Sequence, residues 1–358
     1  MIAKRTDCLR VTRTLTVTPA APEPHAIADA AACLLGGGLV AFPTETVYGL
    51  GVSALEAAAV RRLFAAKGRP ADDPLIVHVA SVQDISPLIA IRPPAVEALA
   101  ARFWPGPLTL VLPRSALVPD EVTAGLDTVA IRVPAHPVAH ALLQAAAIPV
   151  AAPSANLFSR PSPTRAAHVL EDLDGRIDLV LDGGPTWVGV ESTVLDLTGE
   201  VPTVLRPGAV TLDMLRTVLP AARMRGDDSR DSGPQRSPGL LSRHYAPRAP
   251  LTLYDGPSGP ALERLAHDAR EARAAGRRVG VLVADDDALP ALDVLRPPLG
   301  AAGDANAIAA RLYAALRELD AAGVDEILAR AHPVLEGLGD AIGDRLRRAA
   351  AGRVIRCG

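Results

Sequence analysis

The sequence has little lysine, few aromatic residues and few cysteines. Of its 37 basic residues only Lys4 and Lys67 are lysine, and aromatic residues make up 3% of the chain. The three cysteines, Cys8, Cys33 and Cys357, have no metal-binding spacing and suggest no disulfide framework. Such cysteine usage is typical of proteins in a reducing compartment.

Long apolar runs are absent as well. No uninterrupted run approaches the roughly 20 residues of a membrane span, and the first residues do not form an apolar signal core. The net charge of -3 provides no overall attraction to nucleic acid or to an anionic membrane. We therefore expect a cytoplasmic protein without a membrane partner, and we leave direct tRNA binding open because a local basic groove needs no net positive charge.

The 358 residues are enough for two domains. Short β-rich runs mixed with alanine-rich helical stretches predict an α/β domain over residues 1–224. Residues 225–250 have no apolar period and are rich in Gly, Ser, Asp and Pro, which predicts a linker. After it, β and α patterns alternate, and this predicts a small, mostly parallel, Rossmann-like doubly wound domain over residues 251–358.

Lys67 stands out because arginine is used almost everywhere else. Val60, Leu63 and Phe64 recur at helical spacing, and Lys67 continues their stripe, so its side chain should lie on the inward face of the helix. Arg69 follows two residues later. A compact ammonium beside a planar guanidinium suits an anion, but a lysine that extends its charge into water at a helix C-terminus gives the same pattern.

The period of a β-strand places other polar groups on common faces. In one predicted strand Thr128 and Arg132 project to one side, whereas the apolar residues between them project to the other. By the same alternation Thr44, Thr46 and Tyr48 should form a polar edge. An exposed antiparallel face would produce both patterns without any function.

Short polar side chains follow another predicted strand. Ser154 and Asn156 come directly after the apolar run Ile148 to Ala152, at the carboxyl end where open α/β sheets bind ligands. Ser162 precedes a predicted helix with Thr164 as its N-cap. Hydroxyls and N–H groups at a helix start can cradle an anion, although Ser and Asn are also ordinary turn residues.

A glycine pattern suggests a different function. Gly49, Gly51 and Ala54 match the dinucleotide-binding pattern G-x-G-x-x-G/A, which would make the protein a nicotinamide-dependent oxidoreductase. The run before it is too polar for the buried first strand of such a fold, which weakens this interpretation. His78 ends a β-like run, where a lone histidine is more often structural than catalytic, and no nucleophile motif is present.

Seven segments occur in one order along the first half of the chain. They are Phe42 to Gly51, Lys67 to Pro70, Pro74 to His78, Trp104 to Thr109, Ala130 to Pro134, Pro153 to Asn156 and Pro161 to Thr164. Together they resemble the threonylcarbamoyl-adenylate synthases, the YrdC-like family. The segment Ser237 to Pro247, followed by an α/β pattern, resembles the longer two-domain form of that family.

The resemblance implies a YrdC-like catalytic domain with a twisted α/β sheet and a nucleotidyltransferase activity. It implies that L-threonine, bicarbonate and ATP condense to threonylcarbamoyl-AMP and diphosphate, with Mg²⁺ as cofactor and no assigned metal ligands. The product would supply threonylcarbamoyladenosine at tRNA position 37 through downstream transferase machinery. Single-domain relatives bind RNA on a concave basic surface, so an RNA-binding module is the alternative.

The resemblance also implies roles for individual residues. The matching catalytic positions are Lys67, Arg69, Ser154 and Asn156. Those for ATP are Arg69, Asp73, Thr128, Ser154, Ser162, Arg206 and Tyr245, with Tyr245 folding over the nucleotide as part of a lid formed by the linker. Those for L-threonine are Thr46, His78, Arg132 and Ser192, with Arg132 as the clamp for the carboxylate.

One position departs from the family pattern. The family commonly has Asn where this chain has Asp73. A carboxylate beside a triphosphate is repelled unless it meets Mg²⁺ or an arginine. Its predicted contact with ATP therefore depends on what neutralises it.

Overall fold

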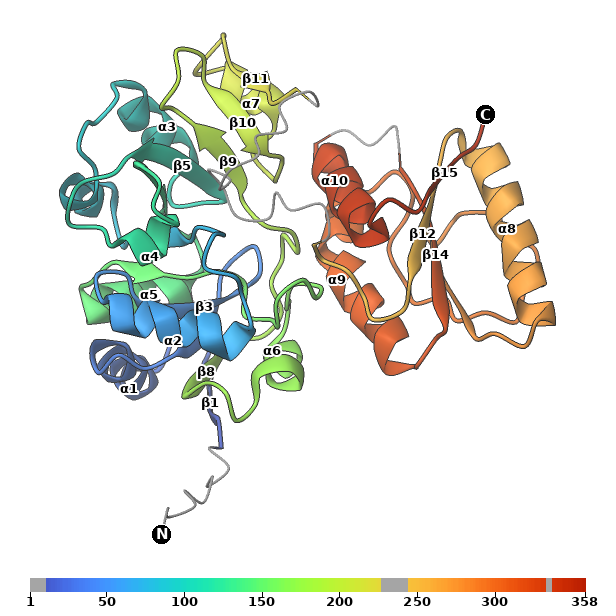
Figure 1. Cartoon of the computed structure of the whole chain (residues 1–358), viewed down its shortest axis with the longest axis horizontal. Helices are drawn as coiled ribbons and strands as arrows, with labels where there is room; N and C mark the ends of the chain where they lie inside the picture. The colour runs from blue at the N-terminus through green and yellow to red at the C-terminus, as the bar shows by residue number, and fades with distance from the viewer. Residues whose placement is uncertain (1–10, 227–243, 333–336) are drawn as a thin grey trace.

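Two sheets of different construction organise the chain (Figure 1). The computed structural model describes residues 11–226, 244–332 and 337–358. Within these residues the first sheet has eleven strands in the order β1-β8-β2-β3-β7-β4-β6-β5-β9-β10-β11, and the second has four in the order β13-β14-β12-β15. No described helix is long and apolar enough to cross a membrane.

The first sheet mixes parallel and antiparallel neighbours. Its strands are β1 (Arg13–Thr16), β2 (Val40–Pro43), β3 (Tyr48–Ser53), β4 (Ile76–His78), β5 (Leu108–Pro113), β6 (Thr128–Arg132), β7 (Val150–Ala151), β8 (Leu179–Asp182), β9 (Thr193–Asp196), β10 (Thr203–Arg206) and β11 (Arg223–Met224). The helices of this part are α1 (Pro24–Leu35), α2 (Ala57–Lys67), the 3-10 helix η1 (Val82–Leu88), α3 (Ala95–Phe103), α4 (Asp120–Thr123), α5 (Pro137–Ala146), α6 (Ala166–Leu173) and α7 (Leu212–Arg216).

Helices cover both faces of the first sheet. Along β2, Ala41 packs into the core that includes α2, α3 and α6, whereas Val40 and Phe42 pack into the core formed with α1 and α5. Strand β6 alternates in the same way. Val129 and Ile131 lie in the larger core and Ala130 faces the other side, as the period-2 pattern predicted.

The predicted helix before Lys67 is confirmed. Val60, Leu63, Phe64 and Lys67 are all buried on one side of α2. Gly68 ends the helix with a left-handed φ of 63°, which a residue without Cβ adopts at little cost. The inward orientation of Lys67 therefore follows from the helical period.

The prediction that Thr44, Thr46 and Tyr48 form one polar edge is confirmed for Thr44 and Thr46, whose hydroxyl oxygens lie 2.8 Å apart. It is wrong for Tyr48, and the segment is not extended as predicted. Thr44 does not continue the strand: its Oγ1 accepts N–H groups of Thr46 and Val47, both at 3.2 Å, and closes a tight hairpin loop between β2 and β3. The hydroxyl of Tyr48 donates to the Gly184 carbonyl at 2.6 Å instead of joining a polar edge. A side chain that caps its own backbone breaks the alternation on which the prediction rested.

The glycine pattern lies inside a strand. Gly49 and Gly51 are buried in β3, and a Cβ at Gly51 would lie 2.8 Å from atoms of Phe42 and Val150. These glycines permit close packing and do not form a turn between a strand and a helix, so the oxidoreductase interpretation is wrong. The N-cap prediction is wrong too, because α6 begins at Ala166 after Arg165 and not after Thr164.

The second sheet is entirely parallel. Its elements are β12 (Leu251–Asp255), α8 (Ser258–Ala274), β13 (Val279–Leu282), α9 (Ala305–Ala321), β14 (Glu326–Arg330), α10 (Gly339–Ala350) and β15 (Val354–Arg356). Helix α8 covers one face, and α9 and α10 cover the other, which is turned toward the first sheet (Figure 1). This is the predicted doubly wound domain.

The two parts share apolar packing. Val47, Val190 and Tyr245 belong to the same cluster as residues of α9 and α10. The domain boundaries at residues 224 and 250 remain predictions. Most of the predicted linker and lid, residues 227–243, lies outside the described part of the chain.

Candidate active site

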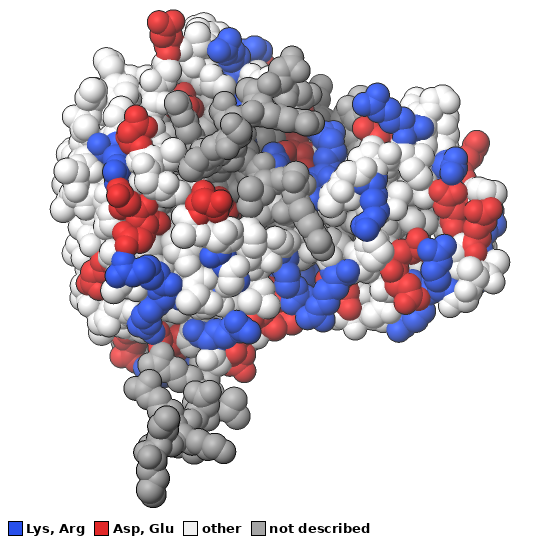
Figure 2. All heavy atoms as spheres, viewed as in Figure 1, with Lys and Arg blue, Asp and Glu red and all other residues white. Residues whose placement is uncertain are grey.

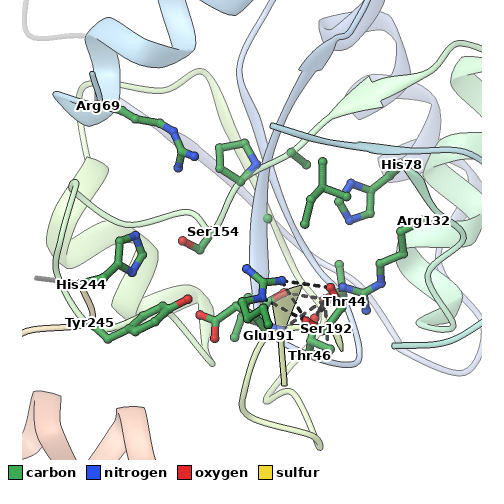
Figure 3. Close-up of a pocket in the computed structure, with 16 residues that line it drawn as sticks. Thr44, Thr46, Arg69, His78, Arg132, Ser154, Glu191, Ser192, His244 and Tyr245 are labelled. Carbon is green, nitrogen blue, oxygen red and sulfur yellow. Dashed lines mark hydrogen bonds between the residues drawn. The ribbon is translucent and has the colours of Figure 1, made fainter. Parts of the chain in front are cut away.

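A pocket forms where four loops of the large domain meet the residues that precede β12 (Figure 3). Its lining residues are Thr44, Thr46, Val47, Gly49, Arg69, Ile76, His78, Arg132, Ala152, Pro153, Ser154, Glu191, Ser192, Arg206, His244 and Tyr245. Eight of the thirteen residues predicted from the sequence are in this set. The other five, Lys67, Asp73, Thr128, Asn156 and Ser162, do not line it.

All four residues predicted for L-threonine line one side of the pocket. Arg132 Nη1 donates to Thr46 Oγ1 at 3.0 Å, and Arg132 Nε donates to the Gly106 carbonyl at 3.2 Å. Arg132 Nη2 also pairs with Glu45 Oε1 at 2.7 Å, and both side chains are buried. The guanidinium is thus held in place before any ligand arrives.

His78 contributes a neutral ring to the same side. Burial, together with the nearby charge of Arg132, lowers the pKa of His78 to about 3. Its Nδ1 is buried and has no hydrogen-bond partner among the described residues. At neutral pH the ring can therefore donate or accept a hydrogen bond without adding charge.

Arg206 and Ser192 form a compact unit at the base of the pocket. Arg206 donates from Nε and Nη2 to the Ser192 carbonyl at 3.1 and 3.0 Å, and from Nη2 to Ser192 Oγ at 3.1 Å. The Ser192 hydroxyl also lies 2.8 Å from Thr109 Oγ1. This network orients a buried guanidinium predicted to bind ATP.

Arg69, Ser154 and Tyr245 lie on the other side of the pocket (Figure 3). Ser154 is held beside β3 because Leu50 N donates to the Pro153 carbonyl and Gly49 forms a β-bridge with Ser154. The hydroxyl of Tyr245 is buried without a hydrogen-bond partner among the described residues. It is available to a ligand in the pocket.

Lys67 supports the pocket from behind. Its side chain is buried, and Nζ donates to the carbonyls of Ser154 and Asn156. Burial, and secondarily the charge of Arg69, lowers the pKa of Lys67. Asn156 likewise turns inward and donates from Nδ2 to the Leu157 and Arg160 carbonyls at 2.7 and 3.0 Å.

Asp73 meets an arginine, which was one of the two conditions for a carboxylate at this position. Its Oδ2 lies 2.8 Å from Arg69 Nη2, and both side chains are buried. Burial raises the pKa of Asp73, while Arg69 opposes that rise. The substitution of the family's Asn is thus accommodated within the protein.

Thr128 and Ser162 lie away from the lining. Thr128 begins β6 opposite Pro113, at the far end of the strand from Arg132. Ser162 is fully buried, and its hydroxyl donates to Glu191 Oε1. Ser162 therefore reaches the pocket only through Glu191.

Sequence reasoning missed Glu191, Glu45 and His244. Burial raises the pKa of Glu191, but Arg345, Arg206 and the Ser162 hydroxyl outweigh it and lower the pKa to about 2. Glu191 is therefore a buried anion at neutral pH. The sequence signal for Glu191 was its position next to Ser192. The arginine that holds it, Arg345, lies 154 positions away in the sequence.

The pocket has no evident site for a resident metal ion among its described residues. The one carboxylate in its described lining, Glu191, is engaged by Arg345, and the neighbouring Glu45 is engaged by Arg132. The one close group of three possible metal ligands in the described ranges is His267, Asp268 and Glu271 on α8, on the outer face of the small domain.

Comparisons with known proteins cover both parts of the chain. Residues 32–208 match a family model described as "Telomere recombination", and residues 210–351 match one described as "Threonylcarbamoyl-AMP synthase, C-terminal domain". The chain is 47% identical to the threonylcarbamoyl-AMP synthase of Bacillus subtilis (strain 168), over 92% of this chain and 94% of that protein. The chain belongs to the threonylcarbamoyl-AMP synthase family.

Other members of the threonylcarbamoyl-AMP synthase family are similar over both domains. The Pyrococcus abyssi enzyme is 44% identical over 93% of this chain and 96% of its own length. The solved structure of P. abyssi Sua5 complexed with L-threonine superposes with a TM-score of 0.91 and 44% identity, covering 97% of this chain and 100% of that one. The predicted YrdC-like fold with a small C-terminal domain is confirmed.

Proposed function

We propose that this member of the threonylcarbamoyl-AMP synthase family is a nucleotidyltransferase that condenses L-threonine, bicarbonate and ATP to threonylcarbamoyl-AMP and diphosphate. The product would pass to downstream transferase machinery for threonylcarbamoyladenosine at tRNA position 37, in the cytoplasm. The observation that carries the proposal is one pocket lined by three buried arginines, Arg69, Arg132 and Arg206, together with the hydroxyls of Thr46 and Ser192.

The chemistry needs positive charge and positioning more than a nucleophile. The threonine amine attacks the carbon of bicarbonate, whose hydroxyl leaves with an amine proton as water, and this gives a carbamate. A carbamate oxygen then attacks the α-phosphate in line while diphosphate leaves. Both the nascent carbamate and the phosphates are anions. Fixed guanidinium groups stabilise such charge without the cost of reorganising water.

We assign the threonine side to Arg132, Thr46, His78 and Ser192. Arg132 would bind the threonine carboxylate while it keeps its contacts with Glu45 and Thr46. The neutral His78 ring and the two hydroxyls would face the threonine hydroxyl. The L-threonine complex of P. abyssi Sua5 supports L-threonine as a ligand of this family.

We assign the ATP side to Arg69, Ser154, Arg206 and Tyr245. Arg69 and Arg206 would neutralise phosphate charge, and the unpartnered hydroxyl of Tyr245 would bind a polar atom of the nucleotide. Lys67 and Asn156 would act by holding the Ser154 segment. We expect Mg²⁺ only as an ion that enters bound to ATP.

A substrate-omission assay tests the proposal. Diphosphate release should require ATP, L-threonine and bicarbonate together. Threonine-independent release, or none at all from the folded protein, would refute it. On the face that Figure 2 shows, acidic and basic side chains of the described residues are interspersed and form no extended basic patch, so this face does not favour the RNA-binding alternative.

A further inference from the structure

One ion pair joins the two domains directly beside the pocket. Arg345 lies on α10 with a fully buried side chain, and its Nε donates to Glu191 Oε2 at 2.8 Å. Tyr313 of α9 donates to the same oxygen, also at 2.8 Å. Two side chains of the small domain therefore hold the carboxylate of a residue that lines the pocket.

Arg345 contacts a second lining residue. Its guanidinium carbon lies 5.3 Å from the centre of the Tyr245 ring, which is the range of a cation–π contact. The ring of Tyr313 lies 5.5 Å from the same ring. Tyr245 has a left-handed φ of 58°, an unfavourable conformation for a bulky residue, so the surrounding packing must maintain it.

The loop that carries Glu191 packs closely against the backbone of α9. Gly189 has a φ of 79°, and a Cβ on it would lie 2.2 Å from the Ala309 oxygen and 2.3 Å from Ala310 Cα. Val190 packs into the apolar cluster that includes α9 and α10. The loop from Gly189 to Ser192 thus takes its position from the small domain.

The opposite side of that loop meets the groups proposed to bind substrate. Ser192 holds Arg206 through the three hydrogen bonds described above. The N–H groups of Val188 and Gly189 donate to the carbonyls of Glu45 and Thr46 at 2.9 and 3.1 Å. A shift of the loop would therefore move groups on both sides of the pocket.

We propose that Arg345 is a positioning residue of the reaction and that the small domain completes the active site through it. Arg345 acts through Glu191 and Tyr245, which it holds in the geometry that binds ATP and threonine. The inference rests on the proposed function. Without Arg345, Glu191 would remain as a buried anion with reduced compensation, and it would move toward other partners such as Arg206.

The test compares two equally buried arginines of the small domain in the full-length protein. Arg345→Met should lower kcat/KM for ATP about a hundredfold, because small misplacements of binding groups are that costly. Arg345→Lys should recover part of the loss, since an ammonium restores the charge but not the planar fork. Arg330→Met is the matched control: Arg330 pairs with Asp287 at 2.7 Å inside the domain and does not contact the pocket.

Both arginine variants should lose thermal stability, so activity is measured below both unfolding transitions. A purely structural role predicts equal kcat/KM in the two variants. Positioning predicts that only Arg345→Met loses activity. If Arg345→Met does not fold, Tyr313→Phe decides: it removes one donor to Glu191 but keeps the ring, and it should lower kcat/KM about tenfold.

Two outcomes overturn the inference while the wild-type enzyme is active. One is wild-type kcat/KM in folded Arg345→Met or, where that variant cannot be folded, in Tyr313→Phe. The other is an equal loss of kcat/KM in Arg330→Met. A wild-type protein without threonine-dependent diphosphate release refutes the proposed function itself, which separates the two failures.

Discussion

The two faces of the small domain differ in what they bury. The buried residues of α8, on the outer face, are all alanine and leucine. Helices α9 and α10, which face the large domain, also bury Arg317, Asp320 and Arg345. Arg317 pairs with Asp172 of α6 at 2.7 Å, and Arg345 pairs with Glu191 at 2.8 Å.

This difference indicates how the two domains are held in one orientation. Apolar packing alone tolerates sliding, whereas a buried charge is stable only opposite its partner. We infer that α8 stabilises the small domain, while α9 and α10 fix its orientation on the large one. Four predictions test this division between residues that stabilise a domain and residues that organise the site.

The largest effect is expected at Lys67, a buried cation that belongs wholly to the large domain. Lys67→Ala removes both hydrogen bonds to the Ser154 and Asn156 carbonyls, and it should cost roughly 2 to 4 kcal/mol in transition-state stabilisation. The rate of threonine-dependent diphosphate release measures the loss of transition-state stabilisation. Lys67→Arg is the finer probe, and full activity in it would show that the compact ammonium has no special role.

The second prediction concerns the contact of the loop with α9. Gly189→Ala should destabilise the protein by about 3 kcal/mol, because the new Cβ meets backbone atoms of α9 and the φ is left-handed. Thermal unfolding measures the loss, and diphosphate release should fall with it. Gly259→Ala on α8 is the control: a Cβ there meets nothing within 4 Å, so stability should be unchanged or slightly higher.

The third prediction is a dependence of stability on pH. Burial lowers the pKa of His244 to about 3, against an ordinary value of 6.5. Below about pH 6.5 His244 therefore becomes protonated in the unfolded chain, whereas in the folded protein it stays neutral down to about pH 3. The free energy of unfolding falls as the pH drops through this window, and above it His244 has no effect. At about pH 5 the loss from this residue is about 2 kcal/mol.

His244→Phe should therefore reduce the drop in Tm between about pH 7.5 and about pH 5. Identical pH profiles of His244→Phe and the wild type would contradict the prediction.

The smallest effect is expected for recognition of the substrate hydroxyl. Thr46→Val keeps the shape but removes the hydroxyl that lies 3.0 Å from Arg132. The preference for threonine over valine should fall by about 1 kcal/mol, or about fivefold in the ratio of kcat/KM values. Serine should be an intermediate substrate of the wild type, and equal wild-type rates with valine would show that the hydroxyl is not read.

Much of the local structure was predictable from the sequence. The stripe from Val60 to Lys67 was read correctly because a helix repeats its burial every three to four residues. The face of Arg132 followed from the alternation of a strand. Eight of the thirteen predicted site residues line one pocket, and the ordered motifs identified them.

The sequence alone is sufficient to predict most elements, the inward faces of α2 and β6, and the cationic and hydroxyl chemistry of the pocket. The three-dimensional structure is needed to find that Lys67 binds two carbonyls, that Asp73 meets Arg69, and that Glu191 is held by Arg345. Local periods arise from the geometry of one segment and can be read along the chain. A contact between residues 154 positions apart depends on how whole domains dock, and no spacing in a single sequence encodes that.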